Sequence, residues 1–286
     1  MIYVGLTGWS DHPDVYSTAT SSTSQLFDYA GHFPIVEIDT SFYAIPSMKS
    51  VQKWLAETPA HFQFIIKGYQ GMTGHMRGKN PYFETKKEMF DAFRKAVEPF
   101  QRAGKLAAVL MQFPPWFDCQ FANVQYIRYV RQQLEGLPVA IEFRNRSWYS
   151  EKYFDGTINL LKEHQLIHTV CDEPQAGDGS VPLVPVATER NAFVRIHGRN
   201  VHAWNSNGRN SEEWRKIRFL YDYTVDELKE LAQHIRKLQQ TCQNVFVVFN
   251  NNSGHDAARN AKQLLTLLDI TYDGLAPKQL GLFEEE

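Results

Sequence analysis

Three short apolar segments of this 286-residue chain carry ionisable side chains at every second position. They read Val36-Glu37-Ile38-Asp39, Ile141-Glu142-Phe143-Arg144 and Val194-Arg195-Ile196-His197. A strand has a period of two, so the polar side chains of each segment share one face. Carboxylates serve as general acids or bases, an imidazole moves protons near neutral pH, and a guanidinium binds anions. These residue types predict a polar site for a ligand or substrate.

Further polar residues stand at the ends of neighbouring apolar segments: Lys67, Gln112, Asp172, Asn250 and Asn251. Burying an unpaired charge costs several kcal/mol or more, so a fold keeps such groups only where they are paired or functional. Acids and bases are nearly balanced in this set. An ion network that caps the core is therefore the alternative to a functional site.

We assign acid–base roles to four of these residues and ligand-binding roles to the others. The rings that follow the strands could stack on bases or sugars. The candidate catalytic residues are Glu37, Glu142, Asp172 and His197. The candidate ligand-binding residues are Trp9, Asp39, Tyr43, Lys67, His75, Gln112, Arg144, Trp148, Arg195, Arg199, Asn250 and Asn251.

No motif of an established cofactor site occurs in the sequence, so we predict no cofactor and no metal. A divalent metal on Glu37, Glu142, Asp172 and His197 stays open as an alternative. The three cysteines, Cys119, Cys171 and Cys242, are too few and too widely spaced for a disulfide framework or a CxxC metal site. We expect them to be small buried hydrophobic residues in a reducing cytoplasm.

Eight apolar segments alternate with segments of helical periodicity. We predict strands at Tyr3–Thr7, Ile35–Asp39, Phe62–Lys67, Leu106–Gln112, Val139–Arg144, Leu166–Cys171, Ala192–His197 and Val245–Asn250. Eight βα units in about 270 residues favour a closed (β/α)8 TIM barrel in the α/β class, with an open doubly wound sheet as the alternative. We expect one domain over residues 1–270, followed by a tail over residues 271–286.

Helix signals support this division of the chain. Thr224 and Glu227 form a capping box, and an apolar stripe begins at Val225. Three connections from strand to helix are long: Gly68–Thr85, Asp172–Asn191 and Gly198–Tyr223. Long loops that carry function gather at the C-terminal face of a barrel, where the active site lies.

The total charge argues against a protein that coats nucleic acid, since 30 Lys and Arg stand against 32 Asp and Glu. Basic residues nevertheless gather in two of the long loops: Arg199, Arg209, Arg215, Lys216 and Arg218 in one, and His75, Arg77 and Lys79 in the other. This local charge predicts an anionic partner, either a small molecule or a nucleic-acid backbone. No apolar segment approaches the ~18 residues of a membrane span, and no signal peptide opens the chain, so we expect a cytoplasmic protein without a membrane partner.

Several segments resemble the YecE-like family, catalogued as domain of unknown function 72. They extend over nearly the whole chain, in the order Gly5–Trp9, Val36–Tyr43, Phe64–Lys67, Gln112–Pro115, Glu142–Trp148, Arg195–Arg199 and Phe249–Asn251. The resemblance implies a TIM barrel and adds weight to the residues at the strand ends, but it supplies no reaction. A weaker similarity links such barrels to endonuclease-IV-type barrels of DNA repair. This chain lacks the many histidine ligands of that type, which puts metal-dependent strand cleavage in doubt.

The C-terminal tail contains Gln279-Leu280-Gly281-Leu282-Phe283. This segment resembles the short peptide by which bacterial proteins dock on the DNA sliding clamp. In such peptides a glutamine, here Gln279, fills a polar pocket, and an apolar pair, here Leu282 and Phe283, fills an apolar one. The alternative is that Leu280, Leu282 and Phe283 pack on the barrel.

Three functions remain open from the sequence. The first is a hydrolase that acts on a phosphate-bearing substrate such as nucleic acid, with Glu37 and Glu142 as acid and base. The second is a non-catalytic DNA-associated protein that its tail recruits to the clamp. The third is a glycoside hydrolase, which needs the carboxyl groups of Glu37 and Glu142 roughly 5–9.5 Å apart.

Overall fold

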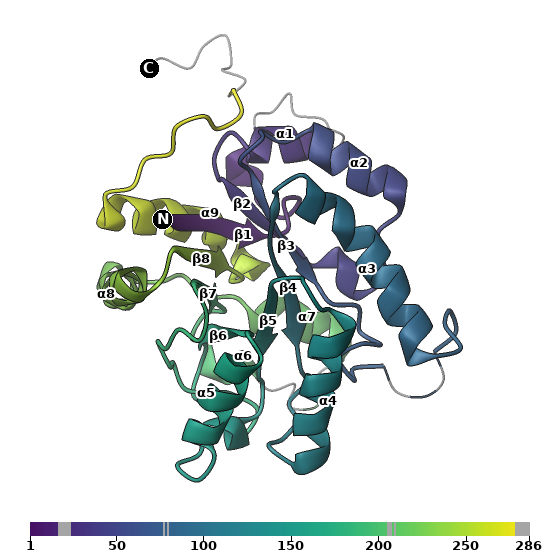
Figure 1. Ribbon diagram of the computed structural model, residues 1–286. Helices are drawn as coiled ribbons and strands as arrows, with labels where there is room; N and C mark the ends of the chain where they lie inside the picture. Colours follow the sequence, from purple (N-terminus) through teal and green to yellow (C-terminus); the bar gives the residue numbers. More distant parts are fainter. Residues whose placement is uncertain (17–23, 77, 79, 205–207, 209, 278–286) are drawn as a thin grey trace.

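Eight parallel strands close into one barrel in the computed structural model, which describes residues 1–16, 24–76, 78, 80–204, 208 and 210–277. Helices surround the strands (Figure 1). The strands are β1 (Ile2–Thr7), β2 (Ile35–Ile38), β3 (Gln63–Lys67), β4 (Leu106–Gln112), β5 (Val139–Glu142), β6 (Ile167–Asp172), β7 (Asn191–Ile196) and β8 (Asn244–Phe249). Because β8 pairs with β1, the sheet has no free edge, and the predicted TIM barrel is confirmed over the open sheet.

The predicted strands are confirmed to within two residues at each end. The prediction was too long at Asp39, Arg144, His197 and Asn250, each of which follows the last paired residue of its strand. There the chain turns into the loops of the C-terminal face. The N–H groups of His197 and Asn250 still donate to the neighbouring strands, at 2.8 Å to Asp172 O and 2.7 Å to Ile196 O, while the side chains make their contacts at the barrel mouth.

The helices are α1 (Gln25–Tyr29), α2 (Met48–Ala56), α3 (Lys86–Arg102), α4 (Phe121–Gln133), α5 (Phe154–Glu163), α6 (Val201–Trp204), α7 (Ser211–Arg218), α8 (Val225–Thr241) and α9 (Asp256–Leu268). The capping box of Thr224 and Glu227 opens α8 as predicted. Val225 was wrongly placed on the apolar stripe: it is the first residue of α8 and is exposed, because the first turn projects beyond the barrel.

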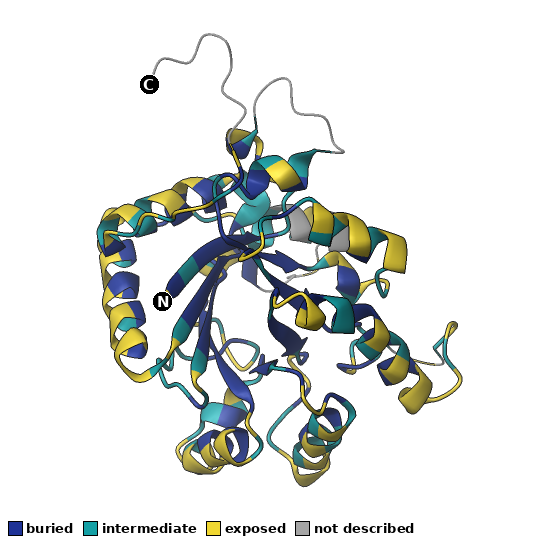
Figure 2. Cartoon of the chain, turned by 45° about the horizontal axis from the view of Figure 1, so that its top comes forward, coloured by how far each residue is buried: buried dark blue, intermediate teal, exposed yellow. Residues whose placement is uncertain are grey.

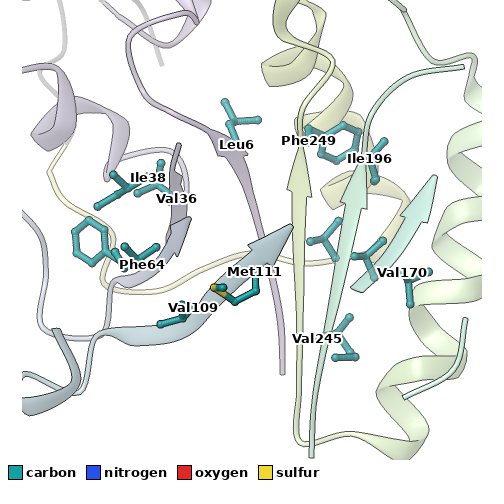
Figure 3. Close-up of a cluster of buried hydrophobic side chains, with 14 of the residues drawn as sticks. Leu6, Val36, Ile38, Phe64, Val109, Met111, Val170, Ile196, Val245 and Phe249 are labelled. Atoms are coloured by element: carbon teal, nitrogen blue, oxygen red, sulfur yellow. The ribbon is translucent and has the colours of Figure 1, made fainter. Parts of the chain in front are cut away.

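Two hydrophobic layers hold the barrel together. Residues that point outward from the strands, such as Leu6, Val36 and Phe249, pack against the helices (Figure 3). A smaller cluster fills the inside of the barrel and includes Ile35, Ile65, Phe193 and Val248. The strands are buried on both sides while the helices expose their outer faces (Figure 2).

The long connections begin at the C-terminal ends of β3, β6 and β7, as predicted. The connection after β7 is the most structured, since it contains both α6 and α7. In the part of the chain that the structure describes, no helix has the length and apolar character to cross a membrane. All three cysteines are free thiols.

Candidate functional site

Arg195 is the centre of a buried ion cluster above the apolar interior of the barrel. Its guanidinium donates two hydrogen bonds to Glu37, at 2.8 Å from Nε and 2.7 Å from Nη2. Its Nη1 donates to Glu142 Oε2 at 2.7 Å and to Gln112 Oε1 at 3.2 Å. The structure thus brings together four predicted site residues from β2, β4, β5 and β7.

Arg144 extends the cluster toward β6. Its Nη1 donates to a carboxylate oxygen of Glu173, and its Nε lies 3.5 Å from Glu142 Oε1. Glu173 also accepts a hydrogen bond from the backbone N–H of Val181 at 2.6 Å. Burial raises the pKa of Glu173 to about 7, although Arg144 acts in the opposite direction. Glu173 could not be identified as a site residue from the sequence, because it lies in a loop that has no periodicity.

His197 lies beside Glu142 at the mouth. Its Nε2 is 3.4 Å from Glu142 Oε1, and its Nδ1 is 3.0 Å from Asn250 Nδ2. Burial and the positive charge of Arg144 lower the pKa of His197 well below its usual range. The imidazole is therefore neutral, and it can accept a proton or bind a metal ion.

The two central glutamates differ in the pKa of their carboxyl groups. Burial raises the pKa of Glu37 despite the attraction of Arg195. Burial also acts on Glu142, but Arg195, His197 and Arg144 outweigh it and hold the pKa of Glu142 well below the usual range. Both oxygens of Glu37 are bound by Arg195, whereas the contacts of Glu142 Oε1 are longer, 3.4 Å to His197 Nε2 and 3.5 Å to Arg144 Nε. Glu142 is consequently the carboxylate with one oxygen that is held less tightly.

Lys67 lies on the side of the mouth formed by β2 to β4, and its Nζ forms no hydrogen bond or ion pair with any residue that the structure describes. Its Nζ is 4.9 Å from the centre of the Phe42 ring. Burial and the nearby Arg195 lower the pKa of Lys67 to about 8. Burial raises the pKa of the neighbouring Asp39. This cation is free to receive an anionic group.

Aromatic side chains line the same side of the mouth. The His75 ring lies 4.9 Å from Phe42 and 6.0 Å from Trp116. Burial, Lys67 and Arg144 lower the pKa of His75 to about 4, so this ring is neutral. Tyr43 and Trp116 are each 53% exposed. The arrangement resembles a stacking platform beside a cation.

The connection after β7 covers the other side of the mouth. Trp204 lies 6.3 Å from the His197 ring, and Phe219 lies 6.1 Å from it. The guanidinium of Arg144 lies 4.9 Å above the ring of Trp204, and that of Arg218 lies 4.5 Å above it. Arg218 Nε is buried without a hydrogen-bond acceptor. Burial and Arg144 lower the pKa of Arg218 to about 9.

Five predicted site residues lie apart from the ion cluster. Asp172 pairs with Arg199 at 2.7 Å and accepts a hydrogen bond from the hydroxyl of Tyr223. The remaining three serve packing or loop structure. Trp148 is fully buried against Phe143, Asn251 donates to Tyr221 O at 2.8 Å, and Trp9 packs against Trp54.

Cys171, the residue before Asp172, is the one that the alternation of β6 places inside the barrel. It pairs in register with Arg195, and its thiol belongs to the same interior layer as Glu142 and His197. In the described part of the chain, Glu142, Cys171 and His197 form the one group whose donor atoms lie close enough for a metal ion, within 4.8 Å of one another. The set of Glu37, Glu142, Asp172 and His197, kept open as an alternative from the sequence, is not among the described groups close enough for a metal ion. The period of two could have identified Cys171.

Several predicted residues lie outside the described part of the chain. These are Arg77, Lys79 and Arg209 in the basic loops, and Gln279, Leu280, Leu282 and Phe283 in the tail. Their roles stay predictions. The structure holds the chain against the barrel as far as Ala276, whose N–H donates to Ala30 O at 3.0 Å.

The fold and the site define a (β/α)8-barrel protein with an ion-paired cluster at its C-terminal mouth. The chain belongs to the family described as "Protein of unknown function DUF72", whose model matches residues 3–281. The resemblance inferred from the sequence is thereby confirmed.

Known relatives agree with this assignment. The UPF0759 protein YunF of Bacillus subtilis is 54% identical over 99% of this chain and 100% of its own length. The UPF0759 protein YecE of Escherichia coli is 40% identical over 67 residues, which cover 23% of each chain. A crystal structure of a DUF72 family protein from Enterococcus faecalis has a TM-score of 0.91 and 38% identity, and it covers 98% of this chain and 100% of that one.

Proposed function

We propose that the protein binds a phosphate-bearing ligand at the barrel mouth and hydrolyses it there. The observation that carries the proposal is the pair of cations without an acceptor, Lys67 on one side and Arg218 on the other. Every other arginine of the cluster is already paired with a carboxylate. A phosphate group offers the acceptors that these two cations lack.

The ligand class follows from the neighbours of Lys67. Tyr43 and Trp116 expose their rings beside it, and exposed rings next to a cation suit a ligand that carries both a base and a phosphate. A nucleotide or a short single strand of nucleic acid has this combination. The total charge limits such binding to a local contact.

Glu142 and His197 are the groups positioned to act on a bound ligand. Glu142 is ionised and His197 is neutral, so either can accept a hydrogen bond from an attacking water and orient it, while the lowered pKa of both groups makes them weak bases. Glu37 is less suited, because both of its oxygens are held by Arg195. Its place in the cluster supports a positioning role: it orients the arginine that binds Glu142.

The binding step is tested by calorimetry with pyrophosphate and with a short single-stranded oligonucleotide. Lys67→Met should weaken binding at least about tenfold, which corresponds to about 1.4 kcal/mol. Lys95→Met, on the exposed face of α3, is the matched control and should bind as the unchanged protein does. Equal affinity of the Lys67 variant and the unchanged protein, or affinity that does not fall with salt, would overturn the proposal.

The catalytic step is tested on a phosphodiester substrate with Glu142→Gln. This variant keeps an oxygen for Arg195 but loses the charge, so turnover should disappear while the thermal unfolding profile stays cooperative. Full activity in this variant would remove Glu142 from the mechanism.

Recruitment to DNA through the tail is a second candidate function, and the segment Gln279–Phe283 favours it. Phe283→Ala should abolish retention on an immobilised bacterial sliding clamp and leave pyrophosphate binding at the mouth unchanged. Retention equal to that of the unchanged chain would remove this function. Glycoside hydrolysis has less support, because Glu142 has a lowered pKa and Glu37 has no free oxygen to donate a proton.

A further inference from the structure

Two buried polar atoms of the ion cluster face each other over a long contact. They are Glu142 Oε1 and His197 Nε2, which lie 3.4 Å apart, and neither has a hydrogen-bond partner of good geometry. Both side chains are fully buried. A poorly satisfied buried polar group costs free energy, so this long contact leaves both atoms able to accept a better partner.

A third donor atom converges on the same point. The Sγ atom of Cys171, one carboxylate oxygen of Glu142 and one ring nitrogen of His197 form a group whose ligand atoms all lie within 4.8 Å of one another. Cys171 is buried, and its thiol makes only a long contact of 3.8 Å with Thr169 O. The three residues lie on β5, on β6 and directly after β7, so the barrel itself fixes their relative positions.

We propose that Glu142, Cys171 and His197 bind a divalent transition-metal ion of the Zn²⁺ class. Thiolate, imidazole and carboxylate together suit a borderline-soft ion, whereas Mg²⁺ and Ca²⁺ prefer oxygen ligands alone. Zinc bonds of about 2.0–2.3 Å place tetrahedral ligands roughly 3.5 Å apart, so a small side-chain rotation brings the three atoms to that spacing. Three protein ligands leave one position open.

The neighbours of the three ligands are arranged to hold them in place. Asn250 contacts the other ring nitrogen of His197 at 3.0 Å, which fixes the orientation of the ring. Arg195 binds Glu142 Oε2 at 2.7 Å and leaves Oε1 available. Such outer contacts orient ligands in known metal sites.

The charges of the cluster also accommodate a cation. The carboxylates of Glu37, Glu142 and Glu173 face the guanidinium groups of Arg144 and Arg195. This leaves one excess negative charge among these five groups when all are ionised, and loss of the Cys171 proton on binding adds a second. A divalent ion balances both, while the nearby cations Lys67 and Arg218, and Arg144 at 3.5 Å from Glu142 Oε1, limit the affinity.

This site does not rest on the phosphate ligand proposed above, because it is measured with the metal alone. Co²⁺ is titrated into the metal-free full-length protein, and the near-ultraviolet absorbance of the cobalt–thiolate bond is recorded. We expect one equivalent of Co²⁺ per chain to produce this band, Zn²⁺ to displace it, and Zn²⁺ to raise Tm. Absence of the band, with Tm unchanged by Zn²⁺, would overturn the proposal.

Substitutions at the proposed ligands test which residues produce the cobalt–thiolate absorbance band. Cys171→Ser should abolish it, and His197→Gln should weaken Co²⁺ binding at least about tenfold. The double variant Cys119→Ser/Cys242→Ser leaves Cys171 as the remaining thiol and should keep the band in full. It settles the assignment even where Cys171→Ser fails to fold, since loss of the band in the double variant would place the metal elsewhere and refute the site.

Discussion

The two sides of the barrel mouth use charged residues in opposite ways. On the side of β5 to β7, the His197 ring lies against Trp204 and Phe219, Glu142 and His197 are fully buried, and Arg144 and Arg195 are paired with carboxylates. On the side of β2 to β4, Lys67 lacks a hydrogen-bond partner among the described residues, and Trp116 is 53% exposed. Most of the charge on the covered side is therefore paired within the protein, while Lys67 on the open side has no paired carboxylate among the described residues.

The largest effect is expected on the covered side, at Arg195. Arg195→Met leaves the buried carboxylates of Glu37 and Glu142 without their shared cation, which should lower the free energy of unfolding by about 3–5 kcal/mol. Urea denaturation followed by circular dichroism measures this change. Arg199→Met, which breaks the partly exposed pair with Asp172, is the control and should cost clearly less. A loss below about 1 kcal/mol for Arg195→Met would show that the cluster does not stabilise the barrel.

Removing the ring of Trp204 should make the covered side of the mouth accessible to solvent, as the open side is. Trp204→Ala deletes a buried ring that packs on His197, Arg144 and Arg218, at an expected cost of about 3 kcal/mol in stability. It should also expose Cys171 to a thiol reagent, which mass spectrometry of the labelled peptide detects. Trp116→Ala on the open side should change neither quantity. Unaltered labelling of Cys171 in Trp204→Ala would mean that other residues close the site.

His75, on the open side, should make the stability of the protein depend on pH. Burial lowers the pKa of His75 to about 4, so the unfolded chain binds this proton more strongly than the folded protein does. The contribution of His75 to the free energy of unfolding is fully present above its unfolded pKa of about 6.5. It is lost as the pH falls toward 4, and the loss is about 2 kcal/mol once solvent screening is included.

His75→Gln should flatten this decline in a series of urea denaturations between pH 7 and pH 4. Part of the decline should persist, because burial also lowers the pKa of His168 to about 4. An identical slope in the variant would show that His75 titrates freely in the folded protein.

The smallest effect concerns the stacking surface. Trp116→Ala should leave stability within about 0.5 kcal/mol of the unchanged protein, since the ring is largely exposed. It should weaken oligonucleotide binding by about 1 kcal/mol, roughly fivefold, and leave pyrophosphate binding unchanged. Equal losses for both ligands would mean that Trp116 supports Lys67 and does not stack on bases.

The alternation of polar and apolar residues was sufficient to predict the barrel and the meeting of Glu37, Glu142 and Arg195, because every strand is buried and its period of two is strict. The prediction failed at β6. We chose Asp172 as a site residue because it is charged, although the period of two places the neighbouring Cys171 on the inner face of the barrel. Glu173 and the covering role of Trp204 could not be predicted. Both depend on the path of long loops, which no periodicity determines.

One seam of the barrel is closed by a side chain. Between β1 and β2, the hydroxyl of Tyr29 in α1 accepts a hydrogen bond from Leu6 N at 2.8 Å and donates one to Ile35 O at 2.8 Å. The backbones also approach closely here, since a Cβ on Gly5 would lie 2.0 Å from Ile35 O. Part of the hydrogen bonding at this seam therefore comes from α1, beside the direct backbone bond from Gly8 N to Glu37 O at 2.8 Å. We expect closure of the barrel at this seam to be coupled to the docking of its first helix.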